Sequence, residues 1–136
     1  MSPTTQDDLG KLILRLAVGI LLIFHGIAKM TNGIAGIESL VVSKGLPGFI
    51  AWGAYVGEVI APLLLIIGIY TRLGALLIVI NMLAAILLAH MGHLYQFTNT
   101  GGWRLELQGL FLFGALAVAF FGAGRFSLAG RGGRWN

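Results

Sequence analysis

Hydrophobic residues in this chain gather into four long runs that are separated by shorter polar stretches. The runs cover residues 11–30, 50–70, 73–90 and 105–121. At a rise of about 1.5 Å per residue, a helix of about 17–21 residues is long enough to cross the hydrocarbon core of a bilayer. The pattern therefore predicts an all-α membrane protein that folds as a single domain, a bundle of four transmembrane helices over residues 1–136.

The polar stretches predict how these runs are connected. Between the first two runs, apolar residues recur at the spacing of one helix face, at Ile34, Ile37, Leu40 and Val41. Gly45 and Pro47 close this segment, so we expect a short helix in the membrane interface between the first and second transmembrane helices. The first ten residues are polar, and we expect them to be frayed. Residues 127–136 are rich in glycine and arginine, and we expect a flexible tail there.

The positions of lysine and arginine predict the orientation of the chain in the membrane. One side carries three of these residues, and the other carries the remaining six, at Lys11, Arg15, Arg72, Arg125, Arg131 and Arg134. Cytoplasmic loops hold the excess of lysine and arginine, so both termini are expected in the cytoplasm. On this orientation Arg15, Arg72 and Arg125 are interpreted as anchors at the inner interface.

Composition narrows the possible functions. The chain is 57% hydrophobic and 10% charged, which is typical of a protein whose main partner is the lipid bilayer. Cysteine is absent, which excludes disulfides, thiolate metal ligands and a cysteine nucleophile within this chain. No basic run with interleaved aromatic residues occurs, so nucleic acid is not expected as a partner.

Ionisable residues inside the apolar runs are the candidate functional residues. Charges are costly in hydrocarbon and usually face a partner or a cavity. Helices that alternate in direction bring the ends of runs one and three beside the starts of runs two and four. Five ionisable residues then come to one side of the membrane: His25, Lys29, Glu58, His90 and Glu106. Their spacing from the helix ends predicts a shared polar pocket in the outer half of the membrane.

Within this set, Glu58 and His25 are the candidates for proton exchange in catalysis. A carboxylate at the depth of Glu58 needs a cationic partner or a bound proton. Pro62 has no N–H to offer the Glu58 carbonyl, so we expect a kink and a free acceptor there. The alternative is a structural salt bridge from Glu58 to Lys29 or Arg104.

Lys29, His90 and Glu106 are the candidate ligand-binding residues. Two of them also have a structural alternative, as does His25. Lys29 can reach the headgroups, Glu106 can interact with the dipole of its own helix N-terminus, and His25 can bond to another helix. His90 and His93 have a spacing that would suit a metal, but two histidines do not make a site, so neither a metal nor haem is predicted.

Small and amide residues on the runs are interpreted as helix-packing positions. Gly53, Gly57 and Ala61 form a stripe that favours close packing, within the bundle or in a homo-oligomer. Asn81 and Gln108 are interpreted as hydrogen-bonding residues between helices.

Several short motifs, in order and at consistent spacing, resemble the DoxX family of small four-helix bacterial membrane proteins. They are Phe24-His25-Gly26-x-x-Lys29, Gly45-Leu46-Pro47, Gly57-Glu58, Gly68-x-x-Thr71-Arg72, His90, Glu106 and Gly122-x-Gly124-Arg125-Phe126-Ser127. The resemblance implies a multi-pass protein of the bacterial inner membrane. It also implies an association with quinone-linked oxidoreductases, as a subunit or partner. Whether the chain itself is an enzyme is left open.

Three functions follow from these observations. The first is a redox-associated protein whose pocket binds a quinone-like molecule and exchanges protons, with electrons supplied by a redox partner protein. The second is a non-catalytic subunit or scaffold of an oxidoreductase complex. The third is a small proton-coupled transporter. The sequence identifies neither the ligand nor the electron donor.

Overall fold

The computed structural model describes all residues, 1–136, and its regular secondary structure is helical apart from one isolated bridge between Phe97 and Trp103. Helix α1 (Pro3–Asn32) is followed by the short helix α2 (Ala35–Ser43). The expected all-α fold is confirmed. The short connector helix lies over the expected residues.

The second and third apolar runs each form a helical stretch assembled from several pieces. Gly48–Ile67 consists of the 3₁₀ turn η1 (Gly48–Trp52), α3 (Gly53–Tyr55), the π-helical turn η2 (Val56–Ile60) and α4 (Ala61–Ile67). Thr71–His93 consists of α5 (Thr71–Ala85), the π-helical turn η3 (Ile86–His90) and the 3₁₀ turn η4 (Met91–His93). The fourth run forms α6 (Glu106–Phe121).

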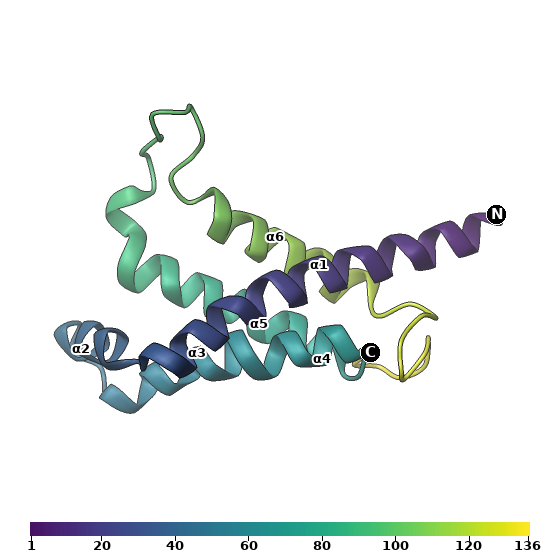
Figure 1. Cartoon of the computed structure of the whole chain (residues 1–136), viewed down its shortest axis with the longest axis horizontal. Helices are drawn as coiled ribbons and strands as arrows, with labels where there is room; N and C mark the ends of the chain where they lie inside the picture. The colour runs from purple at the N-terminus through teal and green to yellow at the C-terminus, as the bar shows by residue number, and fades with distance from the viewer.

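These four helical stretches run alternately in opposite directions and pack side by side (Figure 1). Ten buried apolar residues contributed by all four form one core: Val18, Leu22, Ala61, Leu65, Ala75, Ile78, Met82, Phe111, Ala115 and Val118. Many large apolar side chains also lie on the outside, as expected for a surface that faces lipid. Three of the stretches, α1, Gly48–Ile67 and Thr71–His93, are long and apolar enough to cross a membrane, whereas α6 has 16 residues.

The N-terminal segment is more ordered than the sequence predicts. Helix α1 begins at Pro3, and the Ser2 hydroxyl accepts a hydrogen bond from the Thr5 N–H at 3.3 Å. A serine cap followed by proline in the first helical turn is a strong helix start. The polar residues that were expected to be frayed therefore extend α1.

The C-terminal segment is tied to the bundle, although its composition predicts a flexible tail. The Thr71 hydroxyl donates to Asn136 Oδ1 at 3.0 Å, and the Arg72 N–H donates to the Trp135 carbonyl at 2.9 Å. Asp8 on α1 forms a hydrogen-bonded ion pair with Arg131. The hydrogen bond in this pair raises the pKa of Arg131 above its usual value. We use the name tail end for the region made up of Arg15, Arg72 and residues 122–136.

Two arginines that the sequence places at the inner interface hold the tail end together. Arg15 is only 2% exposed, and its guanidinium donates to the carbonyls of Leu65, Ile66 and Phe126. Arg72 donates to the carbonyls at the end of α6. Arg15 is therefore a buried crosslink between helices and the tail, because the last turn of a helix leaves carbonyls that need donors.

Candidate functional site

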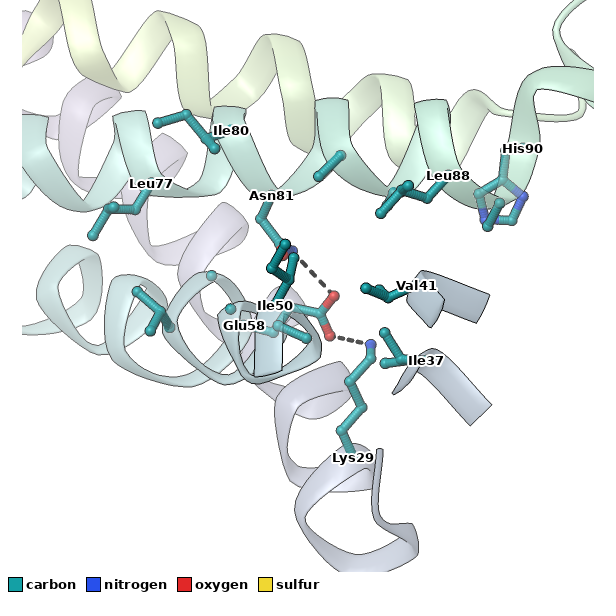
Figure 2. A pocket seen from close by; sticks show the side chains of 17 residues that line it. Lys29, Ile37, Val41, Ile50, Glu58, Leu77, Ile80, Asn81, Leu88 and His90 are labelled. Atoms are coloured by element: carbon teal, nitrogen blue, oxygen red, sulfur yellow. Dashed lines mark hydrogen bonds and ion pairs between the residues drawn. The ribbon is translucent and has the colours of Figure 1, made fainter. Parts of the chain in front are cut away.

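Glu58 is the most deeply buried carboxylate of the predicted site. It lies on η2 and is 6% exposed. One carboxylate oxygen forms an ion pair with Lys29 Nζ, and the other accepts a hydrogen bond from Asn81 Nδ2 at 3.2 Å (Figure 2). Of the two structural partners that the sequence allows, Lys29 is the one observed, while Arg104 bonds to Gln96 instead.

The backbone around Glu58 explains why α1 and η2 come so close. Pro62 cannot donate to the Glu58 carbonyl, and the chain forms a π-helical turn at this point. The Glu58 carbonyl oxygen lies where a Cβ on Gly26 would stand. Gly57 likewise lies directly against the Asn81 side chain. Two glycines therefore allow α1 and α5 to approach the segment that carries the carboxylate.

Lys29 is directed into the bundle from the last turn of α1. Its ammonium group bonds to Glu58, and its own carbonyl accepts a hydrogen bond from the Tyr55 hydroxyl at 3.2 Å. Its side chain is 26% exposed. The structure therefore does not show the alternative interpretation, in which the Lys29 side chain only extends to the lipid headgroups.

Of the other predicted residues, His90 and His25 lie near the Lys29–Glu58 pair, and Glu106 lies apart from it. His90 ends η3, and its Nδ1 lies 3.5 Å from His93 Nδ1. His25 is exposed and packs edge-on against Phe111, with ring centroids 5.7 Å apart. Glu106 is exposed at the start of α6, beside Gly102.

Two cavities adjoin the Lys29–Glu58 pair. The larger cavity, of about 500 Å³, lies among α2, η2, α5 and η3 and is lined mainly by hydrophobic residues (Figure 2). The smaller cavity, of about 140 Å³, lies among α1, α5, η3 and α6. Lys29, Glu58 and His90 line both cavities, and His25 lines the smaller one. Glu106 lines neither.

Asn81 and Gln108 also line the cavities, although the sequence predicts only hydrogen bonds between helices for them, and for Asn81 such a bond is observed. Asn81 holds Glu58 and lines the larger cavity, and Gln108 lines the smaller one. The available signal was an amide inside an apolar run, which marks a position that needs a polar neighbour. The described residues contain no group of three or more His, Cys, Asp or Glu side chains that could hold a metal ion.

A family model named DoxX matches residues 10–91 of this chain. The chain belongs to the DoxX family. The match includes most of the polar site of this DoxX-family chain, from His25 to His90, and ends before α6. With three apolar helices of sufficient length, membership identifies a bacterial membrane protein.

One curated protein is similar to this DoxX-family chain. It is the protein named "Putative oxidoreductase CatD" of Bacillus subtilis (strain 168), 32% identical over 80 residues. The aligned region covers 59% of this chain and 59% of the relative, so the chain spans less than two thirds of that protein. No solved structure matches.

Proposed function

We propose that this DoxX-family chain is a redox-associated protein of the bacterial cytoplasmic membrane. In this proposal all four helical stretches cross the membrane, and both termini are cytoplasmic. The cavity beside Glu58 binds a small molecule of the quinone class and exchanges protons with it. A relative named as an oxidoreductase supports the redox association.

The observation that carries the proposal is the partly buried ion pair between Lys29 and Glu58, which borders an apolar cavity. An ammonium group has three N–H donors, so Lys29 can bond to Glu58 and still donate to a carbonyl oxygen in the cavity. The cavity's apolar side chains suit a quinone ring and the start of its tail. Its volume of about 500 Å³ falls within the range of small-molecule sites.

The chemistry assigned to the chain is proton transfer. Reduction of a quinone to a quinol takes two electrons and two protons, and no residue here carries electrons. A redox partner protein must supply them. Glu58 and His25 are the groups proposed to exchange the protons, while Lys29 stabilises the developing negative charge on the quinone oxygen.

Binding of a short-chain quinone to the purified protein in nanodiscs tests this function. Removing the charged donor in Lys29→Met is expected to weaken binding by about tenfold, the equivalent of about 1.4 kcal/mol. Glu58→Gln is expected to weaken it by a comparable factor. Glu106→Gln is the matched control, because Glu106 is exposed and lines neither cavity. The proposal fails if the unmutated protein does not bind quinones of any tail length.

A scaffold function is the second candidate, and one observation favours it. Both oxygens of Glu58 already have partners within the chain, Lys29 and Asn81. If the cluster only holds the helices together, Glu58→Gln lowers the melting temperature of the protein. The turnover of the redox complex that contains it then stays unchanged per assembled complex. Measuring both quantities on the same variant separates the two candidates.

A further inference from the structure

The two cavities meet at the same ion pair but differ in their linings. In the larger cavity, 11 of 17 lining residues are hydrophobic. In the smaller cavity, only four of nine are, and the polar ones are His25, Lys29, Glu58, His90 and Gln108. Glu58 therefore borders a mainly apolar cavity and a second cavity whose lining has a larger share of polar side chains.

The larger cavity opens on the flank of the bundle. Ile80 lines it and is 62% exposed, and Val56 lines it and is 38% exposed. Ile80 lies near the middle of the helical stretch Thr71–His93, which is long enough to cross a membrane. An exposed apolar residue at that position faces lipid. The opening is therefore suited to an apolar molecule that arrives through the bilayer.

The smaller cavity lies close to helix ends. Gln108, which lines only this cavity, is near the start of α6 (Glu106–Phe121), and His90, which lines both cavities, is the last residue of η3. His25 and Leu107, which also line it, are exposed. Its volume of about 140 Å³ is large enough for several water molecules, and its five polar side chains can supply the hydrogen-bond partners that such waters need.

We infer that Glu58 is reached by two separate routes. The smaller cavity holds water and carries protons between the aqueous phase and Glu58, with Gln108 holding the waters in place. The larger cavity admits the apolar ligand from the lipid. The polar groups that face Glu58 across these spaces are His25 and Lys29 from α1, Asn81 from α5, His90 from η3 and Gln108 from α6. The ligand's identity rests on the proposed function, whereas the separation of routes does not.

Spin labels measure the two environments directly. The chain has no cysteine, so single substitutions Ala84→Cys in the larger cavity and Gln108→Cys in the smaller one can each carry a nitroxide. Collisions with oxygen, which dissolves in lipid, are compared with collisions with a water-soluble nickel chelate. Ile20→Cys on the exposed flank of α1 and Asn99→Cys in the exposed loop give the lipid and water references.

We expect a nickel-to-oxygen ratio several-fold higher at Gln108 than at Ala84, with Ala84 matching Ile20. Equal ratios at Gln108 and Ala84 would overturn it. If the Gln108 label prevents folding, Leu107→Cys reports on the same cavity. With the label at Leu107, Gln108→Leu should lower the nickel collisions and Gln108→Asn should preserve them. A water-holding role is rejected if leucine and asparagine act alike.

Adding a short-chain quinone separates this inference from the proposed function. The quinone should reduce oxygen collisions at Ala84 and leave the ratio at Gln108 unchanged. If the ratios differ as expected but quinone has no effect at Ala84, the two routes stand and the quinone proposal fails. If quinone reduces oxygen collisions at Ala84 while the ratios at Ala84 and Gln108 are equal, the quinone proposal stands and the inference of two routes fails.

Discussion

The two ends of the bundle place charged groups in an apolar setting in different ways. At the tail end, Arg15 is 2% exposed and donates to backbone carbonyls. At the opposite end, which we call the cavity end (Lys29, Glu58, Asn81 and His90), Glu58 is 6% exposed and bonds to side chains of two other helices. Backbone carbonyls cannot leave without unfolding, whereas side chains beside a cavity can exchange partners. The comparison indicates that the tail end is structural and that the cavity end can take part in binding.

The largest expected effect is at the tail end. Arg15→Met leaves the carbonyls of Leu65, Ile66 and Phe126 without their donor. Since a buried acceptor left unpaired is costly, we expect the free energy of unfolding to fall by about 3 kcal/mol. Unfolding in mixed detergent, followed by circular dichroism, measures this. Arg134→Gln is the control, because Arg134 is exposed and stacks only on Trp135. Equal effects of the two substitutions would remove the distinction.

At the cavity end, Glu58→Leu is expected to cost about 2 kcal/mol, because it leaves the Lys29 charge without its partner. The double variant Lys29→Met with Glu58→Leu should recover much of this loss, since no unpaired charge remains. The same detergent unfolding measures the stability of these two variants and of Lys29→Met alone. Quinone binding should stay weak in all of them. Recovery of binding in the double variant would contradict a functional pair.

The close contact between α1 and η2 can be tested without touching a charge. In Gly26→Ala the added methyl group overlaps the Glu58 carbonyl, so the helices must separate. We expect a loss of about 1–2 kcal/mol from this overpacking, together with weaker quinone binding. Gly10→Ala is the matched control, because Gly10 lies on the same helix, its Cβ would stand in open space and it lines neither cavity. Similar losses for both glycines would show that the contact with Glu58 is not responsible, because alanine has the higher helix propensity and by itself should stabilise the helix.

The smallest effect is expected where the tail meets the bundle. Thr71→Val keeps the shape of the side chain and removes the hydrogen bond to Asn136. The expected cost is about 1 kcal/mol in melting experiments, the usual value of one such bond. Faster proteolysis of the tail should accompany it. Thr31→Val, which loses only exposed hydrogen bonds within α1, should change stability and proteolysis less.

Counting residues along the chain was enough to predict that four of the five candidate residues come together at one end of the bundle. His25, Lys29, Glu58 and His90 line the cavities at one end, as the alternating helices require. It was harder to predict which residues of α6 face the cavity. Glu106 and Gln108 are two residues apart, and at about 3.6 residues per turn they point to nearly opposite sides of a helix. Only Gln108 faces the cavity.

The sequence by itself determined the helices, through the length of the apolar runs, and the irregular turn at Glu58, through the missing N–H of Pro62. Tertiary structure decided the partners. The tail has too few apolar residues for its sequence to predict an ordered structure. It is nevertheless held by hydrogen bonds with helices that are distant in sequence. Glu58 could have paired with either of two cations, and the approach allowed by Gly26 selected Lys29. Helix formation depends on local patterns, whereas the choice of partner depends on which helix faces meet.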